Sequence, residues 1–166
     1  MLAIRRLVTV LTVACALCTA ASAADTNIVG TWSLQSWVAQ DQETGTIVDV
    51  FGARPSGYLI YTPGGRMTVN LAAEGRKPLS GDRFSTPAEE RAIAFSTSIA
   101  YSGTYTVQGD AVTHRVEIAT FPNWVGTEQI RFVQVEGDTL TIKTPPIPGP
   151  PDGRKKVMTL VLKRLE

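Results

Sequence analysis

The residue best suited to do chemistry is His114, because it is the one histidine in the chain. An imidazole titrates near neutral pH, so it can exchange a proton with a ligand or hold a ligand's oxygen. A metal centre built on several histidines is excluded, and no Ser-His-Asp spacing or phosphate-binding glycine loop is present. On an extended strand His114 shares a face with Val112, Val116 and Ile118. The alternation therefore predicts that the imidazole points into the apolar interior.

Two polar residues of the next predicted strand are expected to lie near His114. Arg131 and Gln129 are two residues apart, so they share a face, and the connection at 121–126 brings them back toward His114. An inward arginine needs a partner. Glu117 is one candidate, although alternation places it on the face opposite His114 and equally predicts a solvent-facing side chain. If Arg131 has no such partner, it indicates a ligand that carries a carboxylate.

Three interpretations of the predicted interior stay open. In the first, His114 is a core residue bonded to a neighbouring backbone group or hydroxyl, and the aromatic side chains fill a packed barrel that acts as an interaction module. In the second, His114 is the polar anchor of an apolar pocket for a small apolar or aromatic molecule. In the third, His114 and Arg131 are the general acid/base and oxyanion-stabilising groups of a cofactor-independent isomerase, cyclase or lyase. The candidate ligand-binding residues are His114, Arg131, Gln129, Tyr58, Tyr105 and Trp124.

Short strands bounded by turn residues must position these side chains. The predicted strands cover residues 28–40, 46–51, 57–62, 66–71, 104–107, 112–119, 128–135, 139–144 and 155–165. Most are joined by hairpins, of which Pro63-Gly64-Gly65 is the clearest. Nine strands in one open sheet would leave two unpaired edges, and closure removes them. The sequence thus predicts an all-β fold: a single antiparallel up-and-down barrel of about nine strands, with a sandwich as the alternative.

One helix is predicted at residues 87–99. Thr86 is the expected N-cap, Pro87 takes the first helical position and Glu89 completes a capping box. Ala88, Ala92, Phe95 and Ile99 then fall on one face. This stripe favours a lid or plug across one end of the barrel over a helix that crosses its outside.

Three stretches resemble the bacterial lipocalin-like domain family. They are Gly30-Thr31-Trp32, the run 57–65 (GYLIYTPGG), and above all His114-Arg115-Val116-Glu117 continuing to the block 121–129 (FPNWVGTEQ). With Thr144-Pro145-Pro146 the resemblance spans about residues 28 to 165. It implies a calycin-type barrel and supplies very little chemistry. The 121–124 turn is interpreted as mainly structural, with Trp124 capping a barrel end, and the proline-rich run 145–151 as a stiff surface loop.

The first 23 residues read as an export signal. Arg5 and Arg6 precede an apolar run from Leu7 to Leu17, and Ala21-Ser22-Ala23 forms a small-residue cleavage site. The apolar run is shorter than the ~20 residues that a membrane anchor needs. We therefore expect cleavage after Ala23, a domain over residues 24–166, and a periplasmic or secreted location, reached by general secretion or, given the paired arginines, by twin-arginine export.

Cleavage would also remove Cys15 and Cys18, so the exported domain has no disulfide and relies on its core. It removes two of the 16 basic residues and none of the 15 acidic ones, which leaves 14 and 15 and a net charge of −1. This balance predicts neither a nucleic-acid partner nor an anionic membrane surface. No cofactor and no metal are predicted, and the sequence leaves the oligomeric state open.

Overall fold

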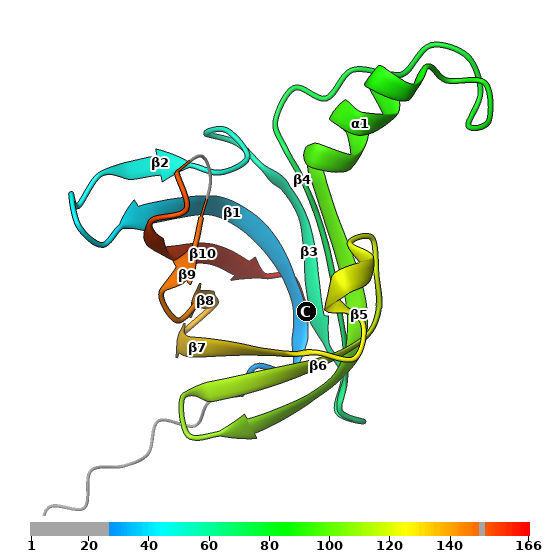
Figure 1. The fold of residues 1–166 in the computed structure, drawn as a ribbon. Coiled ribbons are helices and arrows are strands. Elements are labelled where there is room, and N and C mark those ends of the chain that lie inside the picture. Colours follow the sequence, from blue (N-terminus) through cyan, green and yellow to red (C-terminus); the bar gives the residue numbers. More distant parts are fainter. Residues whose placement is uncertain (1–26, 150–151) are drawn as a thin grey trace, which may run out of the picture.

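A computed structural model describes residues 27–149 and 152–166, and its architecture is the predicted antiparallel β-barrel (Figure 1). Eight strands close the barrel in the order β1-β3-β4-β5-β6-β7-β8-β10, and β10 pairs back with β1. Two short strands, β2 and β9, extend it. The strands are β1 (Gly30–Asp41), β2 (Ile47–Asp49), β3 (Ser56–Tyr61), β4 (Arg66–Ala72), β5 (Ser98–Gln108), β6 (Ala111–Ala119), β7 (Glu128–Glu136), β8 (Thr139–Lys143), β9 (Ile147–Pro148) and β10 (Lys155–Arg164).

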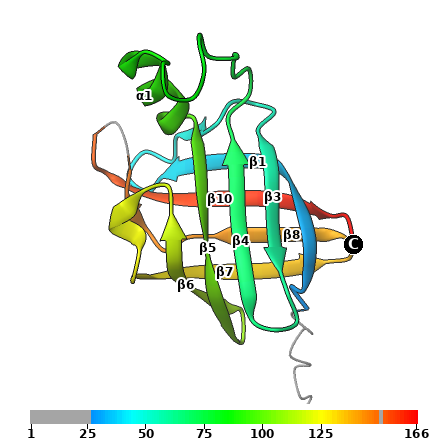
Figure 2. The same cartoon turned by 90° about the vertical axis from the view of Figure 1, so that its right-hand side faces the viewer.

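The two ends of the barrel differ in the length of their connections. At one end, tight hairpins join β3 to β4, β5 to β6 and β7 to β8. Gly65 in the first of these has a φ of 76°, as the predicted Pro-Gly-Gly turn requires. At the other end lie the long connections, which contain β2, the helix α1 (Ala88–Ser96), the 3₁₀ turn η1 (Pro122–Trp124) and β9. Figure 2 shows α1 beyond the end of β5, away from the hairpins.

The end with the tight hairpins is filled by side chains. Trp32 is completely buried there and donates its indole N–H to the carbonyl oxygen of Ile28 at 2.8 Å. The guanidinium carbon of Arg164 lies 4.0 Å from the centre of the Trp32 ring, and its nitrogens donate to the backbone oxygens of Val29 and Asn27. The first and last strands are thus joined where the barrel closes. The Gly30-Thr31-Trp32 start of the domain therefore serves to close and pack the barrel.

A β-bulge in the β5–β6 ladder changes which residues of β6 point inward. Ser102 pairs with Ile118 and Gly103 with Val116, so Glu117 is an extra residue in the ladder. A Cβ on residue 103 would collide with the carbonyl oxygen of Arg115, so only glycine fits. Val116 remains buried, whereas Ile118 is 66% exposed. The prediction that Ile118 shares the inner face of His114 was therefore wrong.

The helix α1 is shorter than predicted, and its cap differs. The N-cap is Pro87 without a side-chain hydrogen bond, while the Thr86 hydroxyl donates to the carbonyl oxygens of Ser80 and Asp82. The predicted capping box is therefore wrong, because the Thr86 hydroxyl is bonded to the preceding loop and does not cap the helix. Ile99 already belongs to β5. Among the described residues, α1 buries no side chain, so it borders the barrel end instead of plugging it.

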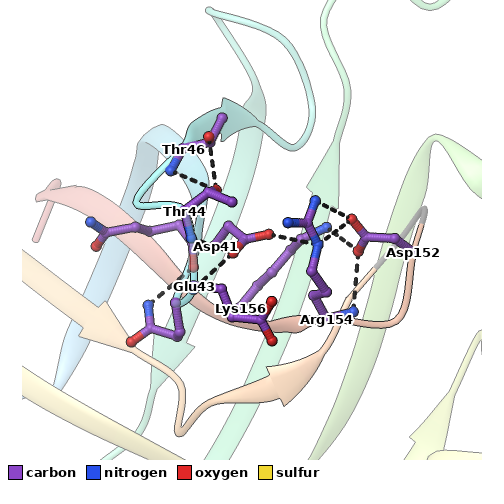
Figure 3. Close-up of polar contacts among 9 residues, drawn as sticks. Asp41, Glu43, Thr44, Thr46, Asp152, Arg154 and Lys156 are labelled. Atoms are coloured by element: carbon purple, nitrogen blue, oxygen red, sulfur yellow. Dashed lines mark hydrogen bonds and ion pairs between the residues drawn. The ribbon is translucent and has the colours of Figure 1, made fainter.

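The connection that carries β9 is fastened to β1 by charged groups (Figure 3). Asp41, buried at the end of β1, accepts hydrogen bonds from the backbone N–H groups of 43–44 and lies 3.2 Å from Nε of Arg154. Asp152 binds both Arg154, at 2.6 Å, and the buried Lys156, at 3.1 Å. The Arg154 guanidinium beside Asp152 holds the pKa of that carboxyl well below its usual range. This network fixes one side of the barrel end at which the long connections lie.

Nine predicted strands match nine of the ten observed ones, with two differences of substance. The strand predicted at 104–107 begins at Ser98, and β9 lies within the proline-rich run that was expected to be a loop throughout. In the part of the chain that the structure describes, no helix has the length and apolar character needed to span a membrane. The predicted export segment lies outside the described residues.

Candidate functional site

A cavity of about 590 Å³ occupies the barrel end formed by the long connections. Its walls are mostly aliphatic, with Leu59, Val69, Leu71, Ile142, Leu160 and Leu162 pointing inward from the strands. Phe51, Phe95, Phe121, Trp124 and Ile147 line it from the connections. The volume falls in the range of roughly 300–1,000 Å³ that is typical of small-molecule sites. The barrel is therefore hollow at one end and packed at the other.

His114 lies at the boundary between the packed half and the cavity. The side chain is 1% exposed and borders the cavity, as the alternation on its strand predicts. Its Nε2 lies 2.7 Å from the hydroxyl of Tyr61, which belongs to the packed core. Its Nδ1 lies 3.0 Å from the hydroxyl of Tyr101, which lines the cavity. Both ring nitrogens are thus engaged, and the three side chains form one chain of hydrogen bonds.

The surroundings of Tyr61 decide which nitrogen of His114 carries the proton. Tyr61 is 1% exposed, and its hydroxyl has no other hydrogen-bond partner among the described residues. A buried hydroxyl that accepted from Nε2 would leave its own proton unsatisfied, at a cost of roughly 1–3 kcal/mol. Tyr61 must therefore donate to Nε2, which places the imidazole proton on Nδ1, from where it is donated to Tyr101.

This order of donors leaves the Tyr101 hydroxyl proton free. Its oxygen already accepts from Nδ1 of His114, so its O–H can donate only to another group. Tyr101 borders the cavity and is 7% exposed. An edge-on contact with Trp124, with ring centres 5.7 Å apart, holds the phenol ring in place. The network thus presents a hydroxyl donor to the cavity.

The assignment makes a spectroscopic prediction that the single histidine renders simple to test. We expect the ¹⁵N spectrum of labelled protein to show a neutral imidazole protonated on Nδ1, unlike the Nε2-protonated form that predominates in free histidine. Because burial, with the Arg131 charge as a second cause, lowers the pKa of His114 to about 3, this state should persist unchanged from about pH 8 to about pH 4.5. A spectrum of the Nε2-protonated form would contradict the donor order.

Arg131 and Gln129 line the cavity beside this network. Gln129 pairs directly with His114 across the β6–β7 ladder, and Arg131 pairs with Val112. One guanidinium nitrogen donates to the carbonyl oxygen of Ile130 at 2.8 Å and another faces Oε1 of Gln129 at 3.4 Å. The inward placement predicted from the sequence is correct. Glu117 is not the partner of Arg131, because it lies outside the barrel and binds Arg66.

Two predicted site tyrosines do not reach the cavity. Tyr58 is 53% exposed on the outer face of the barrel, because its neighbours Leu59 and Tyr61 take the inner positions. Tyr105 packs edge-on against Tyr61 and donates its hydroxyl to the carbonyl oxygen of Thr62 at 2.9 Å. That bond ties Tyr105 to the hairpin end, and it does not line the cavity. Neither tyrosine lies where the sequence predicted it, at the wall of the cavity.

Trp124 and Trp37 supply the large aromatic surfaces of the cavity. Trp124 lies in η1, packs edge-on against Phe121, and borders the cavity from the barrel end, as predicted. Trp37 comes from β1 and packs against Phe51. The buried indole nitrogen of Trp37 has no hydrogen-bond partner among the described residues.

Three residues of the site were not among the six candidate ligand-binding residues and counted only among the aromatic side chains that could fill or line the interior: Tyr61, Tyr101 and Trp37. Tyr61 shares a face with Leu59, two residues before it, but the apolar residues on both faces of this strand leave the inward face undecided from the sequence. For Tyr101 the sequence predicted no strand face, because the strand that holds it was predicted to begin at Thr104. Tyr101 thus lines the cavity and Tyr61 bonds to it through His114, whereas the predicted Tyr58 and Tyr105 do not line the cavity.

The comparisons with known proteins agree with this geometry. The family model described as "Lipocalin-like domain" matches residues 29–165. One curated relative, from Aspergillus oryzae (strain ATCC 42149 / RIB 40), is 40% identical over 87 residues, which cover 47% of this chain and 78% of the relative. That relative is named "4'-hydroxy-3'-methoxypropiophenone carrier protein ppsC". A likeness to a carrier of a small aromatic ketone is consistent with small-molecule binding.

Proposed function

The chain belongs to the lipocalin-like domain family, and from this premise we propose that it binds and carries a small aromatic molecule inside its barrel. The observation that carries the proposal is the cavity of about 590 Å³, which has aliphatic and aromatic walls and a few polar groups on one side. Such a composition suits an aromatic body with one or two oxygen substituents. The export pattern of residues 1–23 supports a carrier located in the periplasm or outside the cell.

The Tyr101 hydroxyl supports a ligand that bears oxygen. Its O–H has no protein acceptor among the described residues, because its oxygen accepts from His114. A purely hydrocarbon ligand would bury this donor unpaired, at a cost of roughly 1–3 kcal/mol. A ligand with a carbonyl or hydroxyl oxygen would satisfy it.

The low basicity of His114 favours a carrier over an enzyme that would use this residue as a general base. A general base works best when its pKa lies near the operating pH. The pKa of His114 is lowered to about 3, chiefly by burial, and both of its nitrogens are engaged by tyrosines. The imidazole is therefore a weak base that holds Tyr101 in place.

The proposal is tested by titrating the protein with 4'-hydroxy-3'-methoxypropiophenone while following tryptophan fluorescence. Trp37 and Trp124 line the cavity, so we expect saturable quenching with one site per chain. Ligand at about 100 times its dissociation constant should also raise the free energy of unfolding by roughly 2.7 kcal/mol.

A matched pair of variants locates the bound molecule. Leu160 points into the cavity from β10, and Val161 points to the opposite face. Leu160→Trp fills part of the cavity and should weaken binding at least about tenfold, which corresponds to about 1.4 kcal/mol. Val161→Trp adds the same side chain outside and should bind like the unaltered protein. Equal binding by both variants would show that the ligand does not enter the barrel.

A further inference from the structure

Arg131 brings the cavity a positive charge that no neighbouring carboxylate balances. None of the described residues that line the cavity is an aspartate or a glutamate. The guanidinium hydrogen bonds go to uncharged groups: the carbonyl oxygen of Ile130, Oε1 of Gln129 and the Tyr101 hydroxyl. Each remaining N–H of this fork is a donor suited to a negatively charged oxygen.

The other titratable groups of the cavity do not offset this charge. Burial raises the pKa of the Tyr61 and Tyr101 hydroxyls, so both phenols stay neutral at physiological pH. Burial lowers the pKa of His114 to about 3, so the imidazole is neutral as well. The serine, threonine and glutamine side chains of the lining carry no charge. At neutral pH, the described lining therefore has a formal charge of +1, and it resides on Arg131.

The Arg131 guanidinium and the Tyr101 hydroxyl lie close together at the wall of the cavity. The guanidinium lies close enough to the Tyr101 hydroxyl to draw the pKa of that phenol back down against the effect of burial. The donor order through Tyr61 and His114 leaves the Tyr101 O–H directed away from the imidazole. One neutral and one cationic donor thus converge at one side of a mostly apolar cavity.

We infer that the Tyr101 hydroxyl and the Arg131 guanidinium together bind an anionic oxygen, a carboxylate or a phenolate, on the aromatic ligand. Tyr61 and His114 are positioning residues that act through Tyr101. The inference rests on the proposed function, because it names the ligand chemistry of the same cavity. Hydrogen bonds in which one partner is charged are stronger than those between neutral groups. The apolar walls of the cavity exclude part of the solvent, which strengthens such bonds further.

The test uses two pairs of probes that differ in one ionisable group. The first pair is 4'-hydroxy-3'-methoxypropiophenone and 3',4'-dimethoxypropiophenone, compared at about pH 9. The acyl group para to the hydroxyl delocalises the phenolate charge, so this phenol ionises below the pKa of about 10 of tyrosine. The second pair is 4-propoxybenzoate and 4-propoxybenzamide at pH 7. Calorimetry gives the dissociation constant of each.

In the unaltered protein we expect the ionised member of at least one pair to bind about ten- to a hundredfold more tightly than its neutral partner. The pair that shows the preference identifies the oxygen as a phenolate or a carboxylate. Arg131→Gln should abolish the preference, because the uncharged amide no longer favours the ionised member of the pair over the neutral one. Arg131→Lys keeps the charge and should retain part of the preference.

Tyr101→Phe tests the second donor. It should weaken binding of the ionised probe about tenfold, with the neutral probe less affected, and thermal unfolding shows whether the variant is folded. Lys163→Gln is the matched control for loss of charge. Its neighbour Leu162 faces the cavity, so Lys163 faces outward, and this variant should keep the full preference.

The outcomes separate this inference from the proposed function. If neither neutral nor ionised probes bind the unaltered protein, the proposed function fails with the inference. If the probes bind but each pair shows equal affinities, or if Arg131→Gln keeps the preference, the inference is overturned and the proposed function stands. A loss of preference in Lys163→Gln as well would assign the effect to net charge and would also overturn it.

Discussion

Replacing His114 with leucine should lower the free energy of unfolding by about 2–6 kcal/mol. Leucine fills a similar volume but can neither donate nor accept a hydrogen bond. The hydroxyls of Tyr61 and Tyr101 would both lose their partner while remaining buried, and each orphaned group costs roughly 1–3 kcal/mol. Urea unfolding monitored by circular dichroism measures the difference.

The control for this prediction removes all three polar groups together. Replacing both partners of a hydrogen bond by apolar groups of similar shape is nearly neutral, whereas removing one partner is costly. The triple variant Tyr61→Phe, His114→Leu, Tyr101→Phe should therefore recover most of the stability that His114→Leu loses. If the triple variant is as unstable as the single one, the loss arises from packing and not from unsatisfied hydroxyls.

The same variants separate stability from binding. Tyr61 does not line the cavity and acts on a ligand only through His114 and Tyr101, so Tyr61→Phe should cost stability and weaken binding less than Tyr101→Phe does. Tyr101 contacts both the imidazole and the cavity, so its replacement affects both properties. A buried polar network of this kind fixes one arrangement of side chains at the floor of the site, where a purely apolar floor would not orient a ligand's oxygen.

The barrel could be predicted from the sequence because its signals are local. Met67, Val69 and Leu71 alternate with polar residues in β4 and are its buried side chains, as Leu140 and Ile142 are in β8. Glycine turns identified the hairpins that join neighbouring strands. Closure followed from the number of strands. The prediction for His114 held because its strand alternates regularly up to Val116, where the bulge begins.

The candidate site was only partly predictable, because its remaining residues depend on tertiary pairing. The segment from Ser98 to Gly103 has few strong strand formers and becomes a strand by pairing with β4, which brings Tyr101 inward. Tyr58 was misplaced because apolar residues occupy both faces of β3, so alternation gives no direction there. The pairing of Leu59 with Trp32 settles the direction and turns Tyr58 outward.

The free energy of unfolding should fall in mild acid, because His114 is held neutral in the folded protein. Its pKa is lowered from 6.5 to about 3 on folding, chiefly by burial, so below pH 6.5 the unfolded chain takes up a proton that the folded protein does not. The contribution of this group to the free energy of unfolding is therefore complete above about pH 6.5. Below that pH it is lost by up to about 1.4 kcal/mol for each unit that the pH falls. The expected loss is about 2 kcal/mol between pH 8 and pH 5.

The choice of pH window isolates the histidine from the carboxylates. Five carboxylates among the described residues also have lowered pKa values: Asp41, Glu74, Asp82, Glu90 and Asp152. Their ordinary values are 3.8 for the aspartates and 4.5 for the glutamates, so their contribution is lost mostly below pH 5. Urea unfolding at pH 8, 6.5 and 5 should therefore show the decline in the unaltered protein and a nearly flat profile in His114→Leu. The variant, although less stable at pH 8, should thus see its disadvantage shrink by about 2 kcal/mol as the pH falls to 5. Parallel profiles would mean that the imidazole takes up its proton equally readily in the folded state, which the Tyr61–His114–Tyr101 arrangement does not permit.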